Sequence, residues 1–379
     1  MKIAISVGEF SADIHGANLV NAIKKINPQT EFFGLGGKLM KEAGVDIEYD
    51  LTKSAIIGFI EPVKKYFFLK KLLLKFAERV KSEKPDLLVL IDYPGFNLRL
   101  AEEVYKFGIP VVYYIAPQVW VWGEKRIEKI KKYVKKVLVI LPFEEDIYKT
   151  AGIDVSFVGH PSVDIVKPTM TKEDSFREFC LSPDTTTVGI FPGSREQELK
   201  KLLPSISEIV KGIRQRIGKV QFVMALSPSI VDSFAEFSSD LFGGTDIKIV
   251  KGKQYDVMNI SDLIIAASGT VAVEACITGR PMIILYKLNW ISFILAKVLT
   301  KVKYISLVNI IGNKEIVPEF VQNFKKNDII EESINLLFKE ELREKMKSDL
   351  RDVAEKLGNP GVSERVAKII LKGCVPNIV

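Results

Sequence analysis

The chain has 379 residues, of which 47% are hydrophobic and 27% are charged, with 25 glycines and 17 prolines. This composition excludes a disordered, collagen-like or low-complexity chain, and the length suits two domains of about 150–200 residues. The three cysteines lie far apart and there are only two histidines, so neither a disulfide framework nor a Cys/His zinc site is expected. The net charge of +7 favours an anionic surface or substrate, but no basic arm or RNP-like motif indicates nucleic acid.

The first segment, Lys2–Val7, is short and runs directly into Gly8, so it reads as a buried strand rather than a signal peptide. No stretch is long and apolar enough to predict a membrane-spanning helix. Further strands are predicted at residues 31–34, 46–49, 87–91, 111–115, 136–141, 155–158, 187–191, 220–225, 247–251, 263–266 and 282–286. Helices are predicted at residues 17–26, 98–107, 124–137, 196–217, 270–278, 328–357 and 361–371.

Strands that alternate with helices throughout the chain predict an α/β fold of doubly wound parallel sheets. Since the series starts again near residue 187, two Rossmann-like domains facing a cleft are expected. Ligands in such folds bind beyond the carboxyl ends of the strands. The polar residues that directly follow strands are therefore the candidates for function.

Two groups of polar residues follow strands of the first half. Glu9, Ser11 and Asp13 place two carboxylates and a hydroxyl in the turn after the first strand, which indicates either a polar binding site or the cap of the next helix. Asp92 directly follows the apolar strand at 87–91. Partial burial would raise its basicity, so Asp92 is a candidate general base or, alternatively, a helix N-cap.

Aromatic residues follow the strand predicted at 111–115. Gln118, Trp120 and Trp122 could form a wall on which a sugar stacks, and buried packing is an equal alternative for either tryptophan. His160, near the expected domain boundary, is interpreted as a structural hydrogen-bonding residue.

A turn with the properties of an anion site opens the second half. Gly193, Ser194 and Arg195 join a strand to a long helix, so helical N–H groups and a guanidinium should converge there. The turn is not a P-loop, because no G-x-x-x-x-G-K-[ST] motif occurs in the chain.

A second turn of this kind consists of Ser268, Gly269 and Thr270, one helical turn before Glu274. Its N–H and hydroxyl groups could hold a diphosphate, and the Glu274 carboxylate could accept hydrogen bonds from a ribose. Two such turns on adjacent strand ends favour a nucleotide site, with ordinary helix capping as the alternative.

Two lysine-rich segments bear on membrane binding. Residues 63–80 combine apolar and aromatic side chains with lysines, which suits the boundary of an anionic bilayer or, alternatively, an internal helix whose lysines reach solvent. The side chains expected to enter the bilayer are Val63, Phe67, Phe68, Leu69, Leu72 and Leu73. Residues 124–137 carry one apolar stripe among lysines, as on a solvated helix face, and could also line the route of an anionic acceptor.

Ordered motifs extend along nearly the whole chain. They are Gly8–Asp13, Ile91–Asn97, Pro117–Trp122, Leu141–Glu144, Gly159–Pro161, Pro192–Glu198, Ser268–Glu274 and Tyr286–Asn309. In these motifs the chain closely resembles the lipid-A-disaccharide synthase family, inverting glycosyltransferases with two Rossmann-like domains of the GT-B type. The resemblance implies transfer of 2,3-diacylglucosamine from its UDP derivative to 2,3-diacylglucosamine 1-phosphate, which gives a β-1,6-linked disaccharide and UDP.

The resemblance also implies roles for domains and residues. Residues 1–165 would bind acceptor and membrane, residues 166–350 would bind the UDP-sugar, and residues 351–379 would form C-terminal helices that pack on an N-terminal domain of the same or a partner chain. Asp92 would take the proton of the acceptor 6-hydroxyl. The acceptor pocket would consist of Glu9, Ser11, Asp13, Gln118 and Trp120. The nucleotide site would consist of Gly193, Ser194, Arg195, Ser268, Gly269, Thr270, Glu274 and Asn309.

The resemblance further implies no metal or other cofactor, a peripheral position on the cytoplasmic face of the inner membrane, and a homodimer with exchanged C-terminal segments. Ala12 stands where the family usually has Gly, and Gly95 where it often has Asp, which leaves Asp92 as the only carboxylate of its motif. The alternatives are another GT-B-like UDP-sugar enzyme, such as a UDP-GlcNAc 2-epimerase or a different glycosyltransferase, and a non-catalytic membrane-surface protein.

Overall fold

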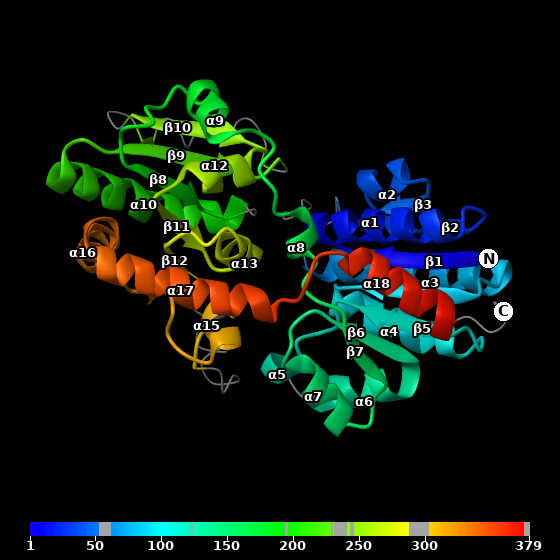
Figure 1. The fold of residues 1–379 in the computed structure, drawn as a ribbon. Coiled ribbons are helices and arrows are strands. Elements are labelled where there is room, and N and C mark those ends of the chain that lie inside the picture. Colours follow the sequence, from blue (N-terminus) through cyan, green and yellow to red (C-terminus); the bar gives the residue numbers. More distant parts are fainter. Residues whose placement is uncertain are drawn as a thin grey trace. The chain divides into compact units, whose positions relative to one another are not determined.

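The computed structural model describes residues 1–52, 62–122, 124–193, 196–228, 230, 241–242, 246–287 and 303–374. The chain divides into two α/β units, one formed by Met1–Pro161 with Leu357–Val379 and the other by Ser162–Lys356 (Figure 1). Each unit is described by itself.

The first unit is built on a seven-stranded parallel sheet in the order β3-β2-β1-β4-β5-β6-β7. Its strands are β1 (Lys2–Val7), β2 (Glu31–Gly36), β3 (Asp46–Asp50), β4 (Leu87–Ile91), β5 (Val111–Tyr114), β6 (Lys136–Val139) and β7 (Val155–Phe157). Its helices are α1 (Phe10–Ile26), α2 (Lys38–Glu42), α3 (Pro62–Glu83), α4 (Pro94–Tyr105), α5 (Val119–Trp122), α6 (Glu124–Tyr133), α7 (Glu144–Thr150) and α18 (Val362–Ile369), with a π-helical turn at Ile370–Cys374. Helices cover both faces of the sheet, so the whole of β4 is buried (Figure 1).

The second unit contains a six-stranded parallel sheet in the order β10-β9-β8-β11-β12-β13. Its strands are β8 (Thr187–Phe191), β9 (Gln221–Leu226), β10 (Ile247–Lys251), β11 (Leu263–Ala267), β12 (Met282–Tyr286) and β13 (Glu319–Val321). Its helices are α8 (Ser162–Ile165), α9 (Lys172–Glu178), α10 (Glu196–Ile217), α12 (Gln254–Ile260), α13 (Thr270–Ile277), α15 (Leu307–Gly312), α16 (Lys326–Phe338) and α17 (Glu340–Lys356). The predicted α/β architecture of doubly wound parallel sheets is confirmed.

Both sheets reverse their strand order in the middle. In the first sheet, β1 pairs with β2 on one side and β4 on the other, and in the second sheet β8 lies between β9 and β11 in the same way. Such a reversal leaves a crevice at the carboxyl ends of the two strands, because their connections leave toward opposite faces. The crevices at β1/β4 and β8/β11 are the positions in each unit where a ligand is expected.

The structure changes several predicted boundaries. The helix expected at 17–26 begins at Phe10, and the helix expected at 124–137 ends at Tyr133, because Lys136–Val139 pairs in the sheet as β6. The amino-terminal part of the first unit ends at Pro161, and α17 continues through the start of the expected C-terminal segment to Lys356.

The chain then returns to the first unit. The backbone N–H of the buried His160 donates to the carbonyl of Leu357 (2.8 Å), and α18 packs against α1 of the same chain. This contact is made by the backbone, so the structural role of the His160 side chain stays a prediction.

Candidate active site

The crevice of the first unit is shaped by a close approach between the ends of β1 and β4. A Cβ atom added at Gly8 would overlap the ring of Tyr93, which follows β4. Position 8, directly after β1, must therefore be glycine for the Tyr93 ring to lie where it does. The ring of Tyr93 also stacks on Phe96, with centroids 5.9 Å apart.

Asp92 and Tyr93 both lie in the left-handed region of backbone space, with φ of 51° and 50°. For residues other than glycine such a conformation costs about 1–3 kcal/mol each and persists only where neighbouring groups enforce it. Asp92 itself is half-buried. The N-cap of α4 is Tyr93, so Asp92 lies one residue before the N-cap position that was its alternative role.

The turn after β1 contains Glu9 and Ser11, both half-buried, at the start of α1. The N-cap of α1 is Glu9, and no side chain of this turn caps the helix. Capping of α1 by Ser11 or Asp13 is therefore wrong, and Glu9 and Ser11 stay candidates for acceptor binding.

Asp13 departs from its predicted role. It is 1% exposed, and its carboxylate accepts hydrogen bonds from the backbone N–H groups of Gly37 (2.8 Å), Leu39 (2.9 Å) and Met40 (3.3 Å). Burial raises the pKa of Asp13, while these three hydrogen bonds lower it. Its carboxylate holds the beginning of α2 and is not exposed to an acceptor, which corrects the assignment of Asp13 to the acceptor pocket.

The segment after β5 presents Gln118 and Trp120. Gln118 is exposed, and Trp120 is half-buried with its Nε1 donating to Glu144 Oε1 (3.1 Å). The Trp120 ring meets Phe143 edge-on, with centroids 5.3 Å apart. Burial raises the pKa of Glu144 to about 7. One edge of Trp120 is therefore fixed by packing, as one alternative predicted; Trp122 lies among the residues whose side chains are not described.

The crevice of the second unit brings the two predicted anion turns to neighbouring strand ends. Gly193 follows β8 and Ser268 follows β11, and these strands pair with each other. Gly269, the N-cap of α13, has no side chain with which to cap the helix, and Gly269 and Thr270 are exposed. Exposed N–H groups at a helix start of this kind suit an anion. Ser194 and Arg195 lie outside the described residues.

Glu274 lies on α13 with a partner that the sequence did not reveal. The hydroxyl of Tyr255, on α12, approaches Glu274 Oε1 at 3.4 Å. Burial raises the pKa of Glu274 to about 7 and raises the pKa of Tyr255. A partly buried carboxylate of this kind binds hydroxyl donors well, which fits the predicted ribose contact.

Asn309 differs from its expected role at the nucleotide. It is completely buried, and its amide bonds to the backbone of Ile316 and Val317 and to Glu319, at 2.7–2.9 Å. A side chain without exposed surface cannot contact a nucleotide directly. Asn309 therefore supports the loop between α15 and β13.

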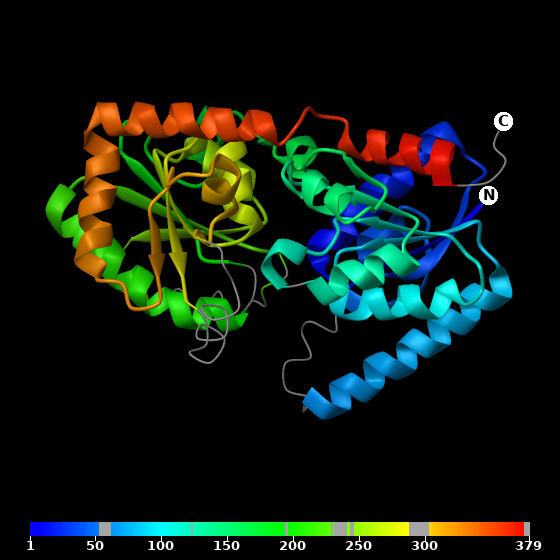
Figure 2. The ribbon, with the colours of Figure 1, turned by 90° about the horizontal axis from the view of Figure 1, so that it is seen from below.

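The exposed surface of α3 corrects part of the membrane assignment. Phe67 and Phe68 are 63% and 41% exposed, and Leu69 is half-buried. Leu72 and Leu73 belong to the hydrophobic core, so they cannot enter a bilayer while the unit is folded. In Figure 2 the amino-terminal end of α3 extends away from the sheet. Val63 lies outside the side chains that the structure describes.

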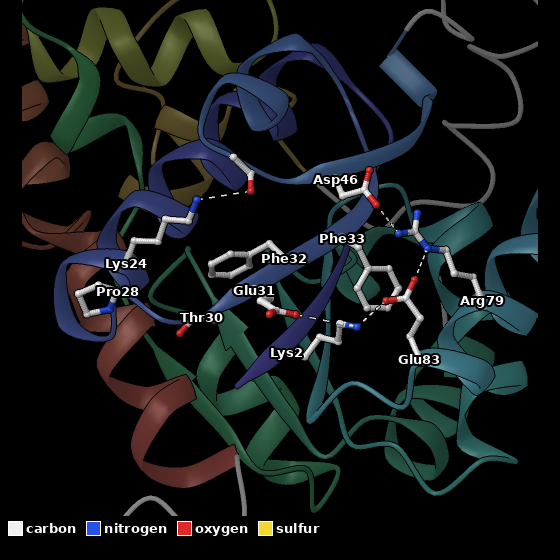
Figure 3. A pocket seen from close by; sticks show the side chains of 11 residues that line it. Lys2, Lys24, Pro28, Thr30, Glu31, Phe32, Phe33, Asp46, Arg79 and Glu83 are labelled. Carbon is white, nitrogen blue, oxygen red and sulfur yellow. Dashed lines mark hydrogen bonds and ion pairs between the residues drawn. The ribbon is translucent and has the colours of Figure 1, made fainter.

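A cavity of about 450 Å³ lies at the amino ends of the first three strands (Figure 3). Lys2 pairs with Glu83 (2.7 Å), and Arg79 pairs with Glu83 (2.6 Å) and Asp46 (2.5 Å). These charges neutralise one another, and the cavity is at the end of the sheet opposite to the crevice. It is therefore not the candidate site.

Among the residues that the structure describes, no helix is long and apolar enough to cross a membrane. Nor does the described part of the chain bring together three or more His, Cys, Asp or Glu side chains that could hold a metal ion.

The chain is similar to known proteins along nearly its whole length. A family model described as lipid-A-disaccharide synthetase matches residues 3–372. The lipid-A-disaccharide synthase of Geobacter sulfurreducens is 39% identical over 373 residues, covering 98% of this chain and 97% of the relative. That of Syntrophus aciditrophicus is 37% identical over 370 residues, covering 97% of each.

Solved structures with the same fold include a UDP-GlcNAc 2-epimerase from Neisseria meningitidis bound to UDP-GlcNAc, with a TM-score of 0.68 and 14% identity, covering 98% of this chain and 100% of that one. Acinetobacter baumannii MurG has a TM-score of 0.60 and 14% identity, also covering 98% and 100%. At such identities the likeness shows the two-domain GT-B fold alone.

Proposed function

The chain belongs to the lipid-A-disaccharide synthetase family and is a glycosyltransferase, and from this we propose that it joins two acylated glucosamines. The donor is UDP-2,3-diacylglucosamine, the acceptor is 2,3-diacylglucosamine 1-phosphate, and the products are the β-1,6-linked disaccharide and UDP. The family match over residues 3–372 carries the proposal. The alternative of a UDP-GlcNAc 2-epimerase is not favoured, since the similar epimerase structures share only the fold.

The donor nucleotide is assigned to the β8/β11 crevice. The N–H groups at the start of α13, the turn at Gly193 and the guanidinium of Arg195 would hold the diphosphate, and Glu274 would hold the ribose. Negative charge grows on the diphosphate as the sugar leaves it. Preorganised N–H donors and a cation stabilise that charge most in the transition state, and no metal is needed for this step.

The acceptor is assigned to the β1/β4 crevice. Asp92 would accept the proton of the 6-hydroxyl as this oxygen attacks the anomeric carbon from the face opposite to UDP, which inverts the configuration. Glu9, Ser11, Gln118 and Trp120 would surround the acceptor sugar. Support comes from the position of Asp92 at the switch point of the sheet and from its enforced backbone conformation.

Both proposed substrates carry acyl chains that leave a bilayer only at a cost of about 0.8 kcal/mol per CH₂. We therefore place the enzyme on the cytoplasmic face of the inner membrane, attached through the exposed aromatic surface of α3, Tyr66–Phe68. Exposed Lys70 and Lys71 lie on the same helix and suit anionic headgroups. An exchanged homodimer would replace the packing of α18 against α1 with the same contact between chains.

The test is UDP release with defined sugars. UDP should appear only when donor and acceptor are both present and both diacylated. Asp92→Asn should lower turnover by about 10²–10⁴-fold, the usual contribution of a general base, with little change in donor affinity. UDP release from unacylated UDP-GlcNAc without acceptor would refute the proposed substrates, and near-normal turnover of folded Asp92→Asn would refute the base.

A further inference from the structure

Three residues at neighbouring strand ends of the first unit have left-handed backbone conformations. They are Asp92 and Tyr93 after β4 and Ile115 after β5, with φ of 51°, 50° and 55°. Strain concentrated in this way needs surrounding groups that enforce it. Of the two groups that do so here, Asn97 ends the sequence motif Ile91–Asn97, whereas no role was predicted for Tyr113 from the sequence.

The carbonyl of Asp92 accepts two hydrogen bonds from buried side chains. Asn97 Nδ2 donates to it at 2.7 Å and the hydroxyl of Tyr113 at 2.8 Å, which occupies both lone pairs of the oxygen. The N–H of Asp92 donates to the carbonyl of Tyr114 at 3.3 Å. The backbone of Asp92 is therefore held from both sides.

Asn97 is itself fixed by the strand ends. Its Nδ2 also approaches the carbonyl of Ile91 at 3.2 Å, and its Oδ1 accepts a hydrogen bond from the hydroxyl of Ser6 at 2.7 Å. Ser6 belongs to β1 and Ile91 to β4, so a single amide joins both sides of the crevice. Such a fully satisfied buried network keeps one geometry.

Neither donor can contact a substrate, because Asn97 and Tyr113 are each 0% exposed. Burial, with a contribution from the charge of Asp92, raises the pKa of Tyr113 well above its usual value, so its hydroxyl stays a donor. Any effect of these two residues on turnover must therefore be indirect, and the carbonyl of Asp92 is a group that both of them contact.

We infer that Asn97 and Tyr113 are positioning residues that hold the strained backbone of Asp92, and thereby its carboxylate, in the reactive geometry. This inference rests on the proposed role of Asp92 as general base. It predicts that loosening the network lowers kcat and leaves substrate binding nearly intact, since a displacement of about 1 Å costs up to ~10²-fold in rate.

Two nearly isosteric variants test the inference. Tyr113→Phe removes one donor from the Asp92 carbonyl and should lower kcat about tenfold, with both KM values within about twofold. Asn97→Asp replaces the donating Nδ2 with a carboxylate oxygen that faces the carbonyl oxygen of Asp92, and it should lower kcat about a hundredfold. Val104→Ala, a completely buried position on the same helix as Asn97, is the control that lowers the melting temperature but not kcat.

A double-mutant cycle with Asp92→Asn separates positioning from general destabilisation. Once the base is gone, Tyr113→Phe should change the residual turnover by less than about twofold. The inference falls if Tyr113→Phe has wild-type kcat, or if it slows Asp92→Asn as much as it slows the wild type. If Asp92→Asn alone keeps normal turnover, the base assignment itself has failed and the inference with it. Should Asn97→Asp not fold, the Tyr113 cycle decides.

Discussion

Replacing Phe67 and Phe68 together with serine should detach the protein from anionic vesicles without unfolding it. The two side chains are 63% and 41% exposed. With 150–250 Å² for a whole aromatic side chain, roughly 200 Å² of apolar surface is left to bury, which corresponds to about 5 kcal/mol on full insertion. Shallow insertion at the headgroup boundary would recover about half of this, or a ~70-fold change in partitioning.

The assay is co-sedimentation with anionic and with neutral vesicles, accompanied by a thermal melt of each variant. Phe338→Ser is the matched control, because Phe338 is 59% exposed but lies on α16 in the second unit. It should leave sedimentation unchanged. Leu72→Ala is the opposite control: it opens a cavity in the core, so it should destabilise the fold by about 2–5 kcal/mol. The fractions of protein bound to vesicles are compared at a temperature well below the melting temperature of Leu72→Ala.

Attachment through the α3 surface is refuted if the Phe67→Ser/Phe68→Ser double variant sediments like the wild type, or if Phe338→Ser releases the protein equally. The first result would show that α3 does not insert. The second would show that binding follows total exposed apolar surface rather than the α3 surface.

Variants in the two crevices and at Asn309 should separate binding from stability. Arg195→Ala should weaken UDP binding in calorimetry and also lower kcat, because its charge opposes the charge that grows on UDP; wild-type values of both would place the nucleotide elsewhere. Gly8→Ala should push aside the Tyr93 ring, costing about 1–3 kcal/mol of stability by denaturant titration and lowering turnover. Asn309→Ala should lower the melting temperature, since two backbone N–H groups lose their acceptor, while the folded variant keeps its UDP affinity.

The strand pattern was predictable because parallel strands covered on both faces are continuous apolar runs. Leu87–Ile91 and Thr187–Phe191 have the predicted bounds for this reason. The helix predicted at 124–137 was too long, because Val134 and Val137 continue the helical spacing of apolar residues across the turn into β6. The spacing of apolar residues alone does not show that the helix ends at Tyr133 and a strand begins at Lys136.

The sequence could place the site only at the ends of particular strands. Polar turns were correctly expected at the carboxyl ends of the strands, because ligands bind there in doubly wound sheets. Whether a polar side chain faces a ligand or another part of the protein depends on tertiary contacts. The carboxylate of Asp13 meets α2 and the amide of Asn309 meets the chain before β13, and neither partner is adjacent in sequence. Likewise, α3 is apolar on too many sides for its sequence to distinguish buried Leu72 from exposed Phe67.

The raised pKa of Glu274 leads to a final prediction about proton release on UDP binding. Burial raises this pKa from 4.5 to about 7 in the folded protein. Between these two values the folded state binds more protons than the unfolded state, so ionising Glu274 lowers stability as pH rises from about 4.5 to 7. Ribose hydroxyls donate to the ionised carboxylate, so bound UDP should lower the pKa and release a proton in this window.

Calorimetric titration of UDP at pH 6, in two buffers of different ionisation enthalpy, measures that proton directly. Because the UDP phosphate itself titrates near pH 6, the informative quantity is the difference between wild type and Glu274→Gln. Glu274→Gln should release fewer protons, bind UDP with less dependence on pH between 5 and 7, and gain stability relative to the wild type as pH rises. Tyr255→Phe, which removes the neighbouring hydroxyl but keeps the carboxylate, should still release the proton. If the wild type releases no more protons than Glu274→Gln, Glu274 does not contact the ribose, because without a hydroxyl donor the negative charge of the bound diphosphate can only raise the pKa of this carboxylate.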